Sequence, residues 1–151
     1  MSEDYFQNNP TAELGSDDGR RLKFCSYGYE RPNGKGSDAD WHMNYLVYTH
    51  KGVRVEVRDS FLTGFLLAQF AKELEEFCNF KRDEVELEPF DPYLGLKFTF
   101  TQSKHVNAKG YIRINEPYKT EVNFLFETNL PYLDIFLKGI QQILLKYPPR
   151  K

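Results

Sequence analysis

Most of this chain consists of segments in which apolar and polar residues alternate, and this pattern constrains the fold more than any other feature. Successive side chains of a β-strand point to opposite faces, so such a segment buries one face and exposes the other. Val53, Val55 and Val57 alternate with charged residues, after a turn at His50-Lys51-Gly52. Seven segments of this kind predict strands, namely Arg20–Tyr27, Met43–His50, Val53–Asp59, Glu84–Glu88, Tyr93–Thr101, Tyr111–Asn115 and Glu121–Glu127.

Two further segments have the period of an α-helix. The first has Thr63 as its N-cap, and its apolar stripe consists of Leu66, Phe70, Leu74 and Phe77. The second has Asn129 as its N-cap and ends before Pro148, because proline cannot continue a helix. Short connections between strands favour antiparallel pairing. The predicted fold class is therefore α+β, an antiparallel β-meander or half-barrel of about six to seven strands with two amphipathic helices.

The chain has 151 residues, a length that favours one domain. Residues 1–18 contain five acidic residues and no lysine or arginine. They also contain Asn-Asn-Pro and Gly-Ser, so we predict a mobile acidic tail over residues 1–18, with a short edge strand around Thr11–Leu14 as the alternative. Residues 19–151 are predicted to form a single α+β domain.

The expected compartment is the cytoplasm. No apolar run is long enough for a membrane helix, and no signal-peptide pattern opens the chain. Cys25 and Cys78 have no CxxC partner, so we expect two reduced, buried thiols, with a long-range disulfide as the alternative.

Known catalytic motifs are missing from the sequence. It has no GxSxG, HExxH, GxGxxG or P-loop pattern, and its three histidines lack the spacing of metal ligands. The net charge of −2 argues against a dedicated nucleic-acid binder. We therefore expect a binding protein without cofactor, metal, nucleic acid or membrane partner, as a monomer or weak dimer. A domain that binds a small molecule or lipid, and an enzyme of unrecognised class, remain the alternatives.

One segment is strongly acidic. Residues 73–91 contain eight acidic residues and two basic ones, a net charge of −6. Carboxylates gathered on one surface attract a basic partner and speed its encounter. A solvated surface without a partner is the alternative interpretation. The candidate partner-binding residues here are Glu73, Glu76, Asp83, Glu84, Glu86, Glu88 and Asp91.

A second candidate surface is the connection Gly28–Asp40, which is long for a plain loop. Aromatic and arginine side chains dominate the energetics of protein interfaces. Tyr29, Arg31 and Trp41 are therefore the candidate anchors in this region, although Trp41 fits a core position equally well.

Several short motifs after residue 20 resemble the WapI-type bacterial immunity proteins. They are Gly28-Tyr29 with Pro32, Asn44-Tyr45-Leu46, Asp59 with Leu62-Thr63 and Leu66, Glu88-Pro89, and Pro149-Arg150. Proteins of this family protect a cell against its own contact-delivered toxin. The resemblance implies a non-enzymatic protein that binds and neutralises a cognate toxin. The toxins of this family include RNA-cleaving domains, which are often basic. The acidic segment would then cover the toxin's functional surface.

Overall fold

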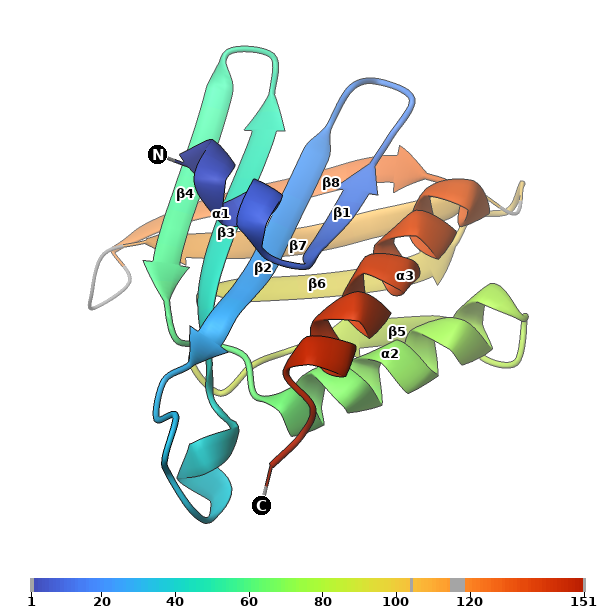
Figure 1. The fold of residues 1–151 in the computed structure, drawn as a ribbon. Coiled ribbons are helices and arrows are strands. Elements are labelled where there is room, and N and C mark those ends of the chain that lie inside the picture. Colours follow the sequence, from blue (N-terminus) through green and yellow to red (C-terminus); the bar gives the residue numbers. More distant parts are fainter. Residues whose placement is uncertain (1, 104, 115–118, 151) are drawn as a thin grey trace.

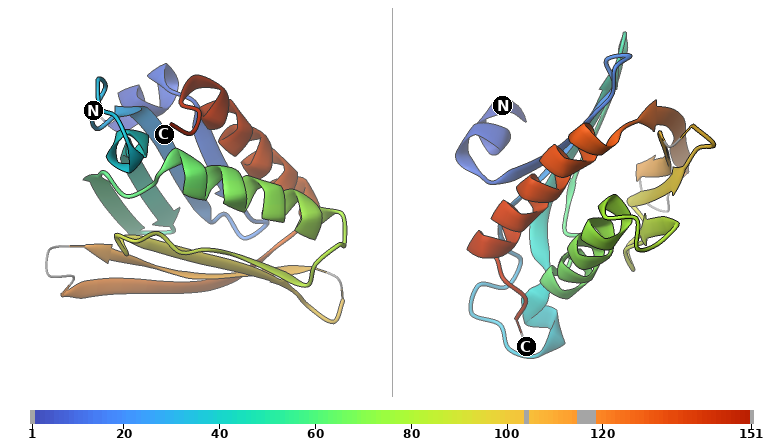
Figure 2. Two further views of the ribbon diagram at one scale, coloured as in Figure 1. Left: turned by 90° about the horizontal axis from the view of Figure 1, so that it is seen from below. Right: turned by 90° about the vertical axis from the view of Figure 1, so that its right-hand side faces the viewer.

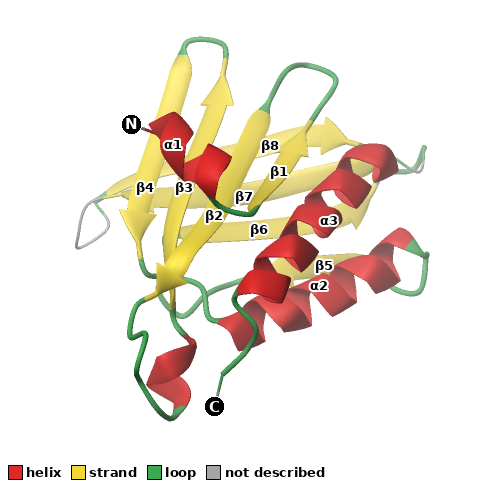
Figure 3. Cartoon of the chain, viewed as in Figure 1, coloured by secondary structure: helices red, strands yellow, loops and turns green. Residues whose placement is uncertain are grey.

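The computed structural model describes residues 2–103, 105–114 and 119–150 (Figure 1). Within these ranges the chain forms two antiparallel four-stranded sheets. The strands of the first sheet, in spatial order, are β1 (Thr11–Gly15), β2 (Arg21–Tyr29), β3 (His42–His50) and β4 (Val53–Asp59). Those of the second are β5 (Glu84–Leu87), β6 (Leu94–Phe100), β7 (Val106–Ile114) and β8 (Thr120–Thr128). The two sheets lie face to face, and their strands cross at a large angle (Figures 1 and 3).

Two long helices close one side of the space between the sheets, where they lie side by side (Figure 2). Helix α2 (Gly64–Cys78) packs against β5, and helix α3 (Leu130–Lys146) packs against β1. Thr63 and Asn129 cap the first turns as predicted, since their side chains accept hydrogen bonds from the backbone N–H groups of Leu66 and Tyr132. The short helix α1 (Ser2–Asn8) lies on the outer face of the first sheet, and the 3₁₀ turn η1 spans Ser37–Asp40.

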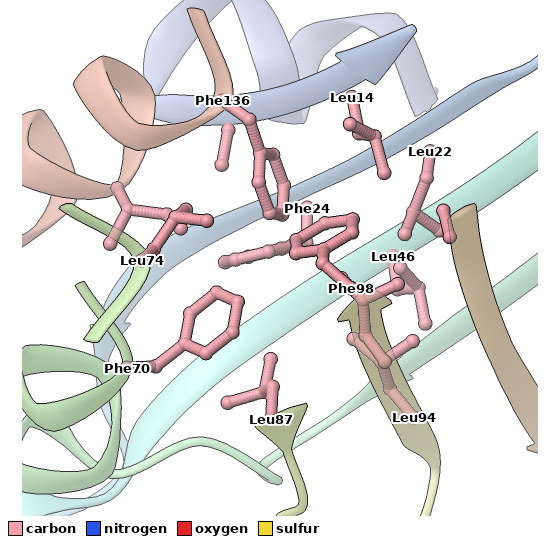
Figure 4. Packing of buried hydrophobic residues seen from close by; sticks show 14 of the residues in the cluster. Leu14, Leu22, Phe24, Leu46, Phe70, Leu74, Leu87, Leu94, Phe98 and Phe136 are labelled. Carbon is pink, nitrogen blue, oxygen red and sulfur yellow. The ribbon is translucent and has the colours of Figure 1, made fainter. Parts of the chain in front are cut away.

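The core lies between the sheets and the two long helices (Figure 4). Phe98 stands at its centre, with its ring centroid 6.2–6.4 Å from those of Phe70, Phe77 and Phe136. All four rings are buried, and such aromatic pairs add to the stabilisation that burial itself provides. A smaller apolar cluster around Cys25, Tyr45 and Val47 lies on the other face of the first sheet, where Tyr5 and Phe6 of α1 cover it.

The predicted fold class is right in being α+β and antiparallel, but the strand arrangement was wrong. Within the described ranges, eight strands form two separate sheets in place of one meander or half-barrel of six to seven strands, and there are three α-helices. The residues of α2 separate β4 from β5, so the chain starts a second sheet there. Strand β7 begins at Val106, before the predicted Tyr111, because its pairing with β6 continues as far as Phe100. Asn115 of the predicted strand lies outside the described residues.

The acidic N-terminal segment also differs from the predicted tail. Thr11–Gly15 form β1, which pairs with β2 from Thr11↔Cys25 to Gly15↔Arg21, as in the alternative of an edge strand. Helix α3 packs on this strand and approaches it closely at Gly139. A Cβ atom at Gly139 would lie 2.4 Å from the carbonyl oxygen of Thr11, so only glycine permits this contact. A single domain over residues 19–151 stays a prediction.

Both cysteines are free thiols. Burial raises the pKa of Cys25 to about 12 and that of Cys78 to about 11, so neither is a reactive thiolate at neutral pH. None of the helices in the described ranges has the length and apolar character that a membrane crossing requires.

Candidate functional site

The acidic residues of β5 form a row on an edge strand. Val85 and Leu87 point into the core, and Glu84 and Glu86 are exposed on the opposite face. Glu88 follows the strand and is also exposed. The row is partly neutralised, because Nζ of Lys97 on the neighbouring strand lies 3.3 Å from Oε2 of Glu84.

The acidic residues of α2 come close to this row through Arg82. Nη1 of Arg82 lies 3.5 Å from Oε2 of Glu73 and 3.1 Å from Oε1 of Glu76, and both glutamates are half-buried. Nε of Arg82 donates to the carbonyl oxygen of Glu84. Arg82 thus joins the helix to the start of β5, but its positive charge offsets part of the negative charge of Glu73 and Glu76. Glu73 and Glu76 therefore offer less free charge to a partner than Glu86 and Glu88.

The two remaining acidic candidates lie at opposite ends of the strand. Asp83 is exposed in the turn before β5, and Asp91 is exposed in the connection that leads to β6. The seven predicted residues therefore extend along one edge of the second sheet, from the end of α2 to the β5–β6 connection. Their role in binding stays a prediction.

The second candidate region divides into structural and exposed residues. Tyr29 is half-buried: the Arg150 guanidinium lies 3.7 Å from its ring centroid, His42 and Tyr147 make edge contacts with it, and its hydroxyl donates to the carbonyl oxygen of Pro148. Arg31 is 60% exposed and lies 3.4 Å from Asp38 Oδ2. Tyr29 thus supports the fold, whereas Arg31 remains accessible to a partner.

Arg150 and Asp40 fasten this region to α2. The Arg150 guanidinium donates to the carbonyl oxygens of Arg31, Pro32 and Ala39. The buried Asp40 carboxylate accepts two backbone N–H groups, that of Arg150 at 2.8 Å and that of Phe65 at 2.7 Å. The chain terminus, the 28–40 connection and the first turn of α2 therefore form one connected unit.

A hollow of about 590 Å³ opens beside this unit. Trp41, which is half-buried, lines it together with Phe65 and Phe90, and Asp38 and Arg150 also contribute to its lining. Phe65 is 64% exposed and Phe90 is 85% exposed. The sequence analysis missed these two phenylalanines. One available signal was that Phe65 falls outside the apolar stripe that begins at Leu66.

A buried polar network joins β2 and β3 near the segment that enters α2. Ser26 Oγ and His42 Nδ1 are 2.7 Å apart, and Asn44 Nδ2 donates to Ser26 Oγ. Asn44 Oδ1 accepts the backbone N–H groups of Phe61 and Leu62, and thereby ties β3 to the segment that enters α2. Nothing in this network resembles a catalytic site open to a substrate, since Ser26, His42 and Asn44 are all fully buried. No group of three or more His, Cys, Asp or Glu in the described ranges is arranged to hold a metal ion.

His42 should make the protein sensitive to acid. Burial lowers the pKa of His42 from 6.5 to about 4, against the opposing effect of Asp40. The unfolded chain then takes up a proton as the pH falls below 6.5, whereas the folded protein does so only near pH 4. The free energy of unfolding should fall by up to about 3 kcal/mol between these two values.

Urea denaturation from pH 7 to pH 4 measures this effect. A His42→Gln variant should lose that part of the decline, and the control His105→Gln, which alters an exposed histidine, should keep it. Equal pH profiles for the two variants would refute the assignment to His42.

The comparisons with known proteins concern nearly the whole chain. The sequence model of the immunity protein WapI-like family matches residues 13–148. Among solved structures, the chain resembles one described as crystal structures of MRP1/MRP2 from Trypanosoma brucei, with a TM-score of 0.52 and 14% identity. The match covers 91% of this chain and 85% of that chain, and at this identity it concerns the fold alone. A search of curated proteins finds no match.

Proposed function

Since the chain belongs to the immunity protein WapI-like family, we propose that it binds a cognate toxin and neutralises it through its acidic surface. Family membership suggests a toxin-neutralising role, and the proteins of this family are generally non-enzymatic. The match over residues 13–148 is the observation that carries the proposal, because it includes most of β1, the other seven strands and both long helices.

The surface that we assign to the toxin is the edge of the second sheet around β5. Glu84, Glu86 and Glu88 are exposed there, and Asp83 and Asp91 extend the acidic row at both ends. A basic, RNA-cleaving toxin domain fits this charge, because a toxin that holds RNA needs a positive surface. Glu73 and Glu76 lie behind the row, and Arg31 and Trp41 provide a second contact region. We further propose a cytoplasmic monomer or weak dimer.

Co-expression tests the role itself. The chain is produced together with the protein encoded immediately upstream in its genome, and growth and co-purification are scored. Rescue of growth together with a stable complex supports the proposal. An upstream protein that is toxic, is not neutralised by this chain and does not co-purify with it would refute the proposal.

Charge reversal tests the acidic surface. The variant Glu84→Lys, Glu86→Lys, Glu88→Lys should associate with the toxin about tenfold more slowly at low salt, because favourable long-range attraction is replaced by repulsion. The difference should shrink as salt screens the charges. Stopped-flow mixing at several salt concentrations measures both effects.

A matched control reverses three exposed carboxylates elsewhere, Asp4, Asp17 and Asp134. It changes the net charge equally but leaves the β5 edge intact, so its association rate should fall less. Equal rates for the two triple variants would show that net charge, and not this surface, governs the encounter.

A further inference from the structure

Strand β4 lies at the margin of the first sheet, and its outer side is an open edge. Among the described strands it pairs with β3, and no strand lies on its other side (Figure 3). Such an edge presents backbone N–H and C=O groups to any chain that can extend the sheet, and many proteins protect it with lysine, proline, a bulge or a very short strand. The seven residues of β4 include no lysine or proline, and their register with β3 has no bulge.

The other three edges of the two described sheets are less suited to pairing. Helix α3 packs on β1 and helix α2 packs on β5, which has only four residues. Strand β8 exposes Glu121 and Glu127 near its two ends, so an antiparallel copy centred between them would bring like charges together. Strand β4 instead exposes both signs of charge, because Arg54 and Glu56 alternate with its valines.

The hairpin geometry determines which backbone groups of β4 point to the open side. A two-residue turn connects β3 to β4, and the pair that flanks this turn is His50↔Val53. In such a hairpin the flanking pair exchanges hydrogen bonds, and hydrogen-bonded pairs then alternate with non-bonded pairs along the ladder. Every second residue of β4, counted from Val53, therefore bonds to β3. The backbone groups of Arg54 and Glu56 point to the open side.

The segment Val53–Val57 is complementary to itself in the antiparallel direction. When two copies are centred on Val55, Arg54 of each copy faces Glu56 of the other, and Val53 faces Val57. The charged pairs are also those whose backbone groups meet, so each pair can exchange two hydrogen bonds. Within one copy Arg54 Nε lies 3.2 Å from Glu56 Oε2, so these two residues carry no net charge together. Their alternation sets the register of the pairing, and the backbone and the valines supply the attraction.

Other registers of this pairing are unfavourable. A shift of two residues places Arg54 opposite Arg54, or Glu56 opposite Glu56, and like charges directly opposite each other are destabilising. A larger shift that sets Glu56 opposite Arg58 restores opposite charges but places Val55 against Asp59. A shift of one residue turns the valines of the second copy to the wrong face of the sheet.

We propose that β4 pairs with β4 of a second copy, so that the chain forms a symmetric dimer in which the two first sheets join into one. Val53, which is 52% exposed in the single chain, would pack on Val57 of the other copy. Backbone hydrogen bonds provide affinity in strand addition of this kind, and the small contact area makes the dimer weak and reversible. The inference does not rest on the toxin, because the toxin surface proposed above lies on the second sheet.

Sedimentation equilibrium of the full chain tests the dimer. The average mass should rise from that of one chain toward that of two as the concentration increases from about 1 to about 500 µM, the range of a weak interface. The variants Arg54→Glu and Glu56→Arg each place two like-charge pairs in the interface. Each variant should therefore associate about tenfold more weakly than the unmodified chain.

A mixture of these two variants tests the register. In a mixed pair the residues at positions 54 and 56 of one copy again face opposite charges on the other, so the mixture should associate about as tightly as the unmodified chain. The matched controls, Lys138→Glu and Asp134→Lys, reverse the two members of an exposed ion pair on α3 and change the net charge by the same amounts. They should associate like the unmodified chain, both alone and mixed.

The outcomes keep the dimer and the immunity role apart. A constant mass of one chain over the whole concentration range would overturn the dimer, whatever the variants do. A dimer that neither single variant weakens, or that the mixture does not restore, would show that β4 is not the contact and would also overturn the inference. The co-expression experiment scores the immunity role separately. A charge-dependent dimer that does not neutralise the upstream-encoded toxin would support the β4 contact and refute the immunity role.

Discussion

An Asn44→Leu variant is expected to unfold with a free energy about 4 kcal/mol lower than that of the unmodified protein. The Asn44 side chain makes four hydrogen bonds in the core, accepting from the backbone of Phe61 and Leu62 and donating to Cys25 and Ser26. Leucine has a similar size but leaves two buried N–H groups without their acceptor, and each such group costs about 1–3 kcal/mol. Chemical denaturation measures the loss.

Asn123→Leu is the matched control, because Asn123 is exposed on β8 and its side chain donates a hydrogen bond to the exposed Glu121. Its free energy of unfolding should change by less than about 0.5 kcal/mol. A small effect of Asn44→Leu would mean that neighbouring groups or water replace the side chain, and that β3 is not tied to the entry of α2 through Asn44.

Truncation of Phe98 to alanine is expected to cost a similar amount, about 4 kcal/mol, because it opens a cavity where the two sheets and the two long helices meet. The ring is fully buried and has aromatic neighbours on α2 and α3. The melting temperature should fall by roughly 10 °C in a chain of this length. Calorimetry measures this change.

Phe90→Ala is the control for this truncation, because the Phe90 ring is 85% exposed and its loss should leave stability almost unchanged. A loss of less than about 1 kcal/mol for Phe98→Ala would show that the core closes around the gap. A large loss for Phe90→Ala would instead show that this exposed ring supports the fold.

The local pattern of apolar and polar residues was sufficient to predict the elements that bury one clearly apolar face. The β3–β4 hairpin followed from the alternating valines, and both long helices followed from their caps and apolar stripes. Strand β1 was not clear from its own residues, because Thr-Ala-Glu-Leu-Gly has weak strand propensity. Its strand conformation comes from pairing with β2, the next strand along the chain, and from the close approach of Gly139, which is distant in sequence.

The candidate site shows the same division between local and distant information. The exposed row on β5 was predictable, because alternation alone places Glu84 and Glu86 opposite Val85 and Leu87. The aromatic hollow was not, because it combines residues from positions 41, 65 and 90 that only the tertiary fold brings together. The partial burial of Tyr29 also depends on a distant residue, Arg150.

The chain is built as two successive units of four strands and one long helix, and each helix packs on the first strand of the other unit's sheet: α2 on β5, and α3 on β1. During synthesis on the ribosome, β1 emerges before the other seven strands, yet α3, which packs on it, emerges after all of them. The part of the first sheet that α3 covers, at β1, therefore stays open until residues 130–146 have left the ribosome. We expect a nascent chain truncated before residue 130 to engage chaperones and remain sensitive to protease.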